Sequence, residues 1–121
     1  MKTKIVVVDD NANNLLLEKD LLIVAGFEVY TAVNASDAMQ LIKEVKPHVI
    51  VLDVQLPDIS GSELARVLRS NKETITTPIV FVTASVLQSD IDHLLCIPNS
   101  AYISKPINTR TFSKEVSQCI K

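Results

Sequence analysis

The stretch KIVVVDDNANN, residues 4–14, decides the fold that the rest of the chain is expected to take. Its first part is a continuous apolar run of β-branched residues, which favours a strand buried on both faces of a parallel sheet. The run stops at two adjacent carboxylates, Asp9 and Asp10, which repel each other unless a proton or a cation separates their charges. Paired acids at the end of a buried strand direct attention to the carboxyl ends of the strands, where open α/β sheets bind their ligands.

Short apolar runs of the same kind recur along the chain, and each of them predicts a strand. The predicted strands are Ile5–Val8, Val29–Val33, Val49–Leu52, Ile79–Val82 and, with a weaker signal, Tyr102–Ile103. Three of these runs are continuously apolar rather than alternating, which is typical of parallel strands that helices cover on both sides.

Segments with the length and period of helices separate the predicted strands. The first has Leu15, Leu16, Leu22 and Ile23 on an expected apolar face, Glu18 and Lys19 on an expected charged face, and Gly26 at its end. We expect Ser36 to cap the second helix and Pro47 to stop it. The remaining helices are predicted after Gly61 and over Leu87–Cys96 and Thr109–Ile120.

Strand and helix therefore alternate five times in the prediction. Because crossovers between parallel strands are right-handed, this order predicts an α/β fold with an open, doubly wound, five-stranded parallel sheet, (βα)5. Five strands suit the order 2-1-3-4-5 of flavodoxin-like folds. A chain of 121 residues fits a single domain, here residues 1–121.

The composition narrows the classes of function. Hydrophobic residues make up 47% and charged residues 21%, which predicts a folded globular protein. A net charge of −2 with scattered Lys and Arg argues against direct nucleic-acid binding, and no apolar run is long enough to span a membrane. Cys96 and Cys119 have neither the spacing of a metal site nor the number for a disulfide framework, so we expect reduced thiols and a cytoplasmic protein.

Polar residues stand where four of the predicted strands end. Asp9 and Asp10 follow the first strand, Asp53 the third and Thr83 the fourth, while the fifth leads into Lys105 and Pro106. The ends of parallel strands share one edge of the sheet, so these side chains are expected to converge. Three carboxylates in one cleft need a cation, and hard oxygen ligands suit Mg²⁺.

A metal beside a carboxylate, with a lysine and a hydroxyl nearby, is an arrangement for phosphoryl transfer. The metal and the ammonium of Lys105 would neutralise phosphoryl oxygens while a carboxylate attacks in line. Asp53 is the natural nucleophile because it is central and is followed by the loop VQLPDISG, in which Pro57 and Gly61 would shape a crevice. Thr83 could donate a hydrogen bond to the phosphoryl group once it is formed.

Plainer interpretations exist for single residues. Asp10 could simply cap the following helix, and Lys105 could be a solvated surface residue. Tyr102 is expected to be a half-buried strand aromatic, and Cys96 a helix residue packed inward. The combination at one predicted edge, rather than any one residue, favours a site.

The motifs DDNANN, VLDVQLPDISG, VTAS and YISKP resemble the receiver domains of two-component response regulators, and the resemblance covers essentially the whole chain. It implies the CheY-like form of the flavodoxin-like fold. The motif YISKPI is similar in particular to stand-alone receivers of cell-cycle signalling and to receivers fused to hybrid kinases.

The resemblance also implies a role for each strand-end residue. Asp53 would accept a phosphoryl group from a phosphohistidine of a histidine kinase or a histidine phosphotransfer protein. The metal ligands for Mg²⁺ would be Asp9, Asp10, Asp53 and the backbone carbonyl of Gln55. Thr83 and Tyr102 would be the switch pair, Lys105 would contact the phosphoryl group, and the Lys105–Pro106 peptide bond would be cis.

The output implied by the resemblance is a contact with a downstream protein through the fourth helix, fifth strand and fifth helix, with the receiver itself a monomer. One position departs from the family pattern. Family members usually carry a glycine four residues before the switch aromatic, where this chain has Pro98 in CIPNSAY. Since proline cannot take a positive φ, we expect the loop before the fifth strand to follow another path.

Three other classes of function compete with a receiver. Metal-dependent aspartyl phosphatases resemble a DxDxT pattern, whereas Asp53 is followed by Val54 and Gln55. An interaction module that is never phosphorylated would be expected to lack part of the set that is complete here. A flavin or dinucleotide carrier would need a glycine-rich phosphate loop, and Gly26 and Gly61 are the only glycines.

Overall fold

Strand and helix alternate five times in the computed structural model, which describes residues 2–85 and 87–120. In chain order the elements are β1 (Lys4–Val8), α1 (Ala12–Val24), β2 (Glu28–Ala32), α2 (Ala35–Val45), β3 (Val49–Asp53), α3 (Gly61–Arg69), β4 (Ile79–Thr83), α4 (Gln88–Leu95), β5 (Ser100–Ser104) and α5 (Phe112–Gln118). Within this part of the chain, no helix has both the length and the apolar character needed to cross a membrane.

The strands form one parallel sheet in the order β2-β1-β3-β4-β5, which confirms the predicted topology. The register brings the carboxyl ends together, because Val8 pairs with Leu52 and Asp53 pairs with Val82. On the far side, Thr83 pairs with Ser104, directly before Lys105. The residues that follow β1, β3, β4 and β5 therefore meet at one edge of the sheet.

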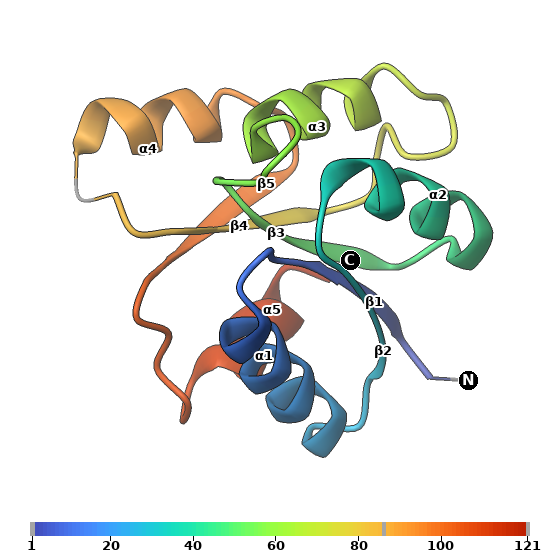
Figure 1. Cartoon of the computed structure of the whole chain (residues 1–121), viewed down its shortest axis with the longest axis vertical. Helices are drawn as coiled ribbons and strands as arrows, with labels where there is room; N and C mark the ends of the chain where they lie inside the picture. Colours follow the sequence, from blue (N-terminus) through green and yellow to red (C-terminus); the bar gives the residue numbers. More distant parts are fainter. Residues whose placement is uncertain (1, 86, 121) are drawn as a thin grey trace.

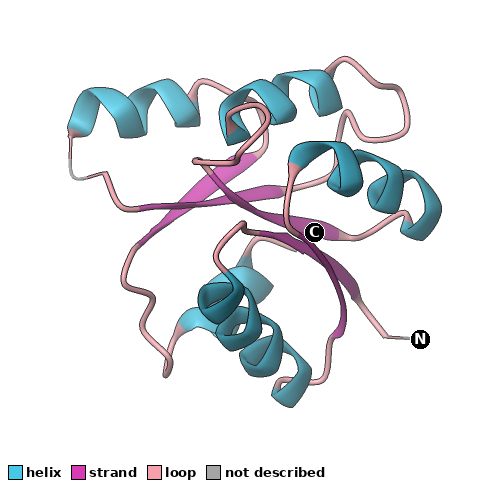
Figure 2. Ribbon diagram, viewed as in Figure 1, coloured by secondary structure: helices cyan, strands magenta, loops and turns pink. Residues whose placement is uncertain are grey.

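Helices cover both faces of the sheet, with α1 and α5 on one face and α2, α3 and α4 on the other (Figure 1; Figure 2). Alternate residues of each strand point into different layers. In β1, Val6 and Val8 pack in the cluster under α2–α4, whereas Ile5 and Val7 pack in the cluster under α1 and α5. Because both faces are buried, the strand is apolar throughout, as the continuous run in the sequence predicts.

Side chains other than the predicted one cap α2. Asn34, not Ser36, is its N-cap, and the Asn34 side chain accepts from the Asp37 amide at 2.7 Å. The carboxylate of Asp58, in the loop after β3, accepts from the amides of Ala35 and Ser36 at 2.9 Å each. The predicted cap was wrong because a carboxylate 22 residues away in sequence takes the Ser36 amide, which no local pattern reveals.

Helix α1 does not have the predicted division into an apolar and a charged face. Glu18 is buried on the same side as Leu22, while Leu16 is 57% and Ile23 46% exposed. The buried positions are 18 and 22, with Leu15 partly buried beside them. Apolar residues on nearly every side of this helix made its periodicity ambiguous. The prediction that Cys96 packs inward was also wrong, because it is exposed at the end of α4.

Candidate functional site

Asp53 lies at the carboxyl end of β3, the middle strand of the sheet, and is 5% exposed. Its Oδ1 accepts from the Gln55 amide at 3.3 Å. Gly61, the first residue of α3, packs against the backbone here, and a Cβ at this position would clash with the carbonyl oxygen of Asp53. A glycine is therefore needed for α3 to begin so close to the strand end.

Asp9 and Asp10 follow β1 and approach Asp53. One carboxylate oxygen from each of the three residues lies within 4.8 Å of the other two. Asp9 is fully buried, and its Oδ1 accepts from the Asn11 amide at 2.9 Å. Burial raises the pKa of Asp9, repulsion from Asp53 raises it further, and the hydrogen bond from Asn11 opposes the change.

The helix after these acids is capped by Asn11, whose side chain accepts from the Asn14 amide at 3.0 Å. The capping role considered for Asp10 is therefore taken by its neighbour. Asp10 is exposed, whereas Asp9 is fully buried. Asp9 and Asp10 thus belong to the same cluster of carboxylates, but only Asp10 is accessible to solvent.

Lys105 supplies the positive charge of this edge. Its Nζ lies 3.3 Å from Asp53 Oδ2 and 3.7 Å from Asp9 Oδ2, and its amide donates to the Thr83 carbonyl at 2.8 Å. Burial alone would lower the pKa of Lys105, but the attraction of the nearby carboxylates outweighs it and the pKa is raised. The Lys105–Pro106 peptide bond is cis, the geometry that the resemblance implies.

Thr83 faces a hollow of about 460 Å³ beside Asp53. Its Oγ1 accepts from the Ser85 amide at 3.1 Å, and Ser85 Oγ in turn donates to Asp90 of α4 at 2.7 Å. The hollow is lined by Asp53, Val54, Gln55, Ser62, Thr83, Ala84, Ser85, Asp90, His93, Leu94 and Lys105. Asp53, Thr83 and Lys105 therefore line one hollow that is large enough for a phosphoryl group.

The structure places Tyr102 apart from this group. It lies on β5, paired with Phe81 of β4, and is 39% exposed. It is exposed rather than half-buried as predicted, because its side chain lies on the outer strand of the sheet, and it does not line the hollow. Gln55 does line the hollow, at the start of the loop after Asp53.

Comparison with known proteins identifies the family. The family model for the response regulator receiver domain matches residues 5–117. This chain belongs to the response regulator receiver family. It is 33% identical over 116 residues to the polar-differentiation response regulator DivK of Brucella anthropi, with 96% of this chain and 94% of the relative covered.

Solved receiver structures have the same fold. A CheY-like receiver domain protein from Methanospirillum hungatei superposes with a TM-score of 0.86 at 26% identity, covering 98% of this chain and 93% of the other. The chemotaxis response regulator CheY4 of Vibrio cholerae gives a TM-score of 0.93 at 24% identity, covering 99% and 100%. The fold is that of CheY-like receivers, which serve two-component signalling.

The loop before β5 accommodates Pro98 because the positive φ falls on the next residue of the chain. Asn99, not the residue at the position of the family glycine, has the positive φ, 57°. Its side chain donates to the Thr76 carbonyl at 2.6 Å. Arg69, at the end of α3, donates to the carbonyls of Pro98 at 2.8 Å and Thr77 at 2.7 Å. This loop is thus tied to the segment before β4 by a guanidinium.

Several residues of the receiver site escaped the sequence analysis. Asp90 and His93 of α4 line the hollow, and His93 Nε2 lies 2.8 Å from Arg66 Nη2 of α3. The sequence analysis considered residues that directly follow a strand. Asp90 and His93 do not follow a strand, because they lie on helix α4, which covers one face of the sheet. Glu18 was assigned to the charged face of its helix, although it is buried at 2% exposure.

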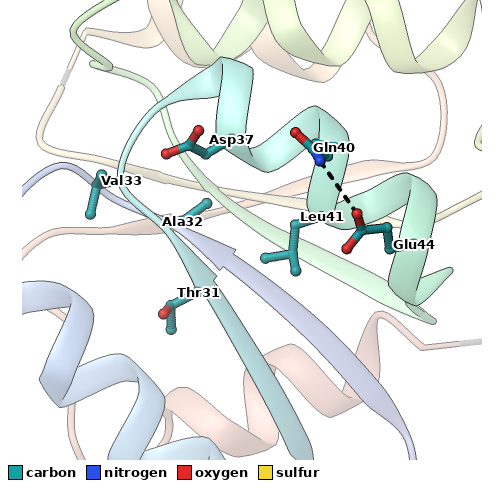
Figure 3. A pocket seen from close by; sticks show the side chains of 7 residues that line it. All are labelled: Thr31, Ala32, Val33, Asp37, Gln40, Leu41 and Glu44. Atoms are coloured by element: carbon teal, nitrogen blue, oxygen red, sulfur yellow. Dashed lines mark hydrogen bonds between the residues drawn. The ribbon is translucent and has the colours of Figure 1, made fainter.

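A second hollow of about 350 Å³ lies at the β2 edge of the sheet, beside α2 (Figure 3). Asp37, Leu41 and Glu44 of α2 line it together with residues of β2, and Gln40 donates to Glu44 at 3.4 Å. The polar residues of the other strand ends, Asp9, Asp10, Asp53, Thr83 and Lys105, do not line this space. Of the two hollows, the first is therefore the one that the strand-end side chains Asp53, Thr83 and Lys105 line.

Proposed function

We propose that this receiver takes a phosphoryl group onto Asp53 from a phosphohistidine. The observation that carries the proposal is the position of Asp53 Oδ2, 3.3 Å from Lys105 Nζ in a cluster with two further carboxylates. In the transfer, an Asp53 oxygen forms a bond to phosphorus while the N–P bond of the phosphohistidine breaks. The imidazole leaves with the electron pair of that bond, and Lys105 balances charge on the phosphoryl oxygens.

The carboxylate cluster fits Mg²⁺. It offers hard oxygen donors, and the buried Asp9 Oδ2 has no hydrogen-bond partner in the described part of the chain. Asp9, Asp10, Asp53 and the backbone carbonyl of Gln55 would hold the ion. When bound, Mg²⁺ supplies neutralisation of the phosphoryl oxygens and of the crowded acids.

The donor is a histidine kinase or a histidine phosphotransfer protein, and the output is a change of protein contacts. A phosphoryl group on Asp53 would draw the Thr83 hydroxyl out of its hydrogen bond with the Ser85 amide. Tyr102 would then turn inward, and the surface of α4, β5 and α5 would change. Exposed apolar residues support a protein contact there, since Leu87 is 60% and Leu95 43% exposed.

The proposal is tested with acetyl phosphate and Mg²⁺, followed by intact-mass measurement. The wild-type chain should gain one phosphoryl group, and Asp53→Asn or a chelator should abolish the gain. Asp20→Asn, which removes an exposed acid of α1, is the matched control and should be labelled normally. Equal labelling of Asp53→Asn would reject Asp53 as the acceptor.

The switch is tested separately with beryllofluoride, a phosphoryl mimic, and amide NMR. Shifts should extend from Asp53 to Tyr102 and α4, and Thr83→Ala should restrict them to the site. Thr83→Ala should still accept the phosphoryl group, because the hydroxyl is not the nucleophile. Shifts confined to the carboxylate cluster in the wild type would leave a phosphoryl carrier without a switch.

A further inference from the structure

A side-chain contact joins α3 to α4 at the wall of the hollow beside Asp53, and phosphoryl transfer does not use it. Nη2 of Arg66 lies 2.8 Å from Nε2 of His93, which is 27 positions further along the chain. Arg66 follows Ser62 by one turn of α3, and both Ser62 and His93 line the hollow. The Arg66–His93 contact is therefore a bridge between two helices that flank the phosphoacceptor.

The chemistry of the two side chains fixes the state of His93 in this bridge. A guanidinium carries only donors and is not deprotonated in proteins, so Nε2 of His93 has to be the acceptor. The ring is then neutral, and its hydrogen is on Nδ1. An imidazolium has a hydrogen on both nitrogens and cannot accept. The bridge therefore exists only while His93 is uncharged.

The surroundings of His93 offer a charged ring another partner. The charged groups around it are Arg66 of α3, Asp90 and Asp92 of α4, and Asp53 and Lys105, which line the same hollow. Asp92 accepts from Gln88 at 2.8 Å. Asp90 precedes His93 by three residues and also lines the hollow, so the two side chains are neighbours on the helix surface. Arg66 would repel an imidazolium at position 93, whereas Asp90 would attract it.

A phosphoryl group on Asp53 would change the charge of this hollow. A phosphoryl group carries about −1.5 to −2 charges at neutral pH, whereas the carboxylate that it modifies carries one. The hollow therefore becomes more negative, and nearby negative charge favours the protonated form of a histidine. Histidine is also the side chain whose charge ordinarily changes between pH 5 and 8. His93 is thus placed to respond to phosphorylation at neutral pH.

We propose that His93 is a charge sensor of the phosphoacceptor hollow: a phosphoryl group on Asp53 favours proton uptake by His93, and the proton breaks the bridge to Arg66. The proton comes from solvent and takes the Nε2 lone pair that accepts from Arg66, which frees α4 from α3. Both side chains are exposed, so the bridge contributes little to stability and a modest change in charge is enough to break it. The inference rests on the proposed function, because the added charge appears only if Asp53 is the acceptor.

The first test is NMR of the histidine ring nitrogens in the unmodified protein at pH 8. The chain has two histidines, His48 and His93, so each signal is assigned by its loss in the corresponding Gln variant. His48 is an internal reference, because its Nδ1 accepts from the Lys4 amide at 2.9 Å and its hydrogen should therefore be on Nε2. His93 should have the opposite tautomer, and Arg66→Met should abolish that preference at His93 alone. A wild-type His93 with its hydrogen on Nε2 would overturn the proposal.

The second test adds beryllofluoride and Mg²⁺ at pH 7. The ratio of protonated to neutral His93 should rise at least about threefold, as expected for one added charge across a partly solvated hollow. His48 lies before β3, at the opposite end of the sheet, and should not respond. Beryllofluoride that binds without changing the protonation of His93 would overturn the sensor role.

The third test uses the reciprocity of linked equilibria, by which a proton on His93 should strengthen the binding of the phosphoryl mimic. Between pH 8 and pH 6, the affinity of the wild type for beryllofluoride should rise at least about threefold relative to His93→Gln. Glutamine is the matched variant, because its oxygen can accept from Arg66 but takes up no proton. His48→Gln should keep the wild-type pH dependence. The same pH dependence in wild type and His93→Gln would contradict the coupling.

The failure of this proposal is distinguishable from failure of the proposed function. If Asp53 is not labelled and beryllofluoride does not bind, the proposed function is wrong and the sensor role falls with it, while the tautomer of His93 still decides whether the bridge exists. If Asp53 is labelled and His93 does not respond, the sensor role alone is wrong.

Discussion

The two helix layers of this receiver bury polar groups in opposite ways. On the side of α2 and α3, the buried Thr74 hydroxyl donates to the Leu68 carbonyl. On the side of α1 and α5, Glu18 is buried still more deeply, and its Oε2 has no partner in the described part of the chain. The first group is satisfied and supports the packing of its layer, whereas the unsatisfied oxygen of the second costs stability. Burial of a polar side chain therefore has to be judged by its partners.

The largest effect is expected from a cavity in the apolar layer. Leu64 of α3 is fully buried, and Leu64→Ala should lower the free energy of unfolding by about 3–4 kcal/mol, measured by urea denaturation with an unchanged m-value. Val67→Ala on the same helix, at a position that is 43% exposed, should cost less than about 1 kcal/mol. Similar losses for the two variants would mean that this layer is not closely packed.

The pH dependence of the free energy of unfolding should report on Glu18, the unsatisfied group in the layer of α1 and α5. The pKa of Glu18 is raised from 4.5 to about 8 by folding, so the folded state binds the proton more tightly than the unfolded state. Its contribution is complete below about pH 4.5 and is lost as the pH rises toward 8.

Other carboxylates also titrate, so the measurement is the difference between wild type and Glu18→Gln. Urea unfolding at pH 5 and pH 8.5 should show that the wild type loses more stability than the variant. A difference that is constant between these pH values would place the titration of Glu18 outside the window and contradict its burial as the cause.

A smaller loss is expected where a buried polar group is satisfied. Thr74→Val keeps the shape but removes the donor to the Leu68 carbonyl, and should cost about 1–2 kcal/mol. Thermal unfolding of Thr74→Val and Thr74→Ser separates the hydroxyl from the methyl group, because serine retains the donor. Comparison with Glu18→Leu, which should gain stability, tests the contrast between the two layers directly.

The smallest effect on stability is expected at the exposed member of the acidic cluster. Asp10→Asn should change the stability of the metal-free protein by no more than about 0.5 kcal/mol, since the side chain is solvated and repulsion is relieved. It should nevertheless weaken Mg²⁺ binding, measured by calorimetry, because a carboxylate is lost from the cluster. A marked loss of stability without metal would show that Asp10 is a structural acid.

The sequence alone was sufficient to predict the sheet and the edge at which its strand-end residues meet. The continuous apolar runs reflect burial on both faces, which is a property of each strand by itself, and the order of strands and helices limits the topology. Because the carboxyl ends of parallel strands share one edge of the sheet, the sequence predicted that Asp9, Asp53 and Lys105 meet there. In the structure Lys105 contacts both carboxylates. Their proposed roles still depend on the experiments above.

Tertiary structure decided which side of α1 is buried and what ties the loops together. Apolar residues surround α1, so its period could not show that Glu18, rather than Leu16, faces the core. The cap of α2 by Asp58 and the clamp of Arg69 on the Pro98 loop join residues more than 20 positions apart. Such contacts have no local signal, because they depend on which segments the sheet places side by side, and only the folded chain determines that.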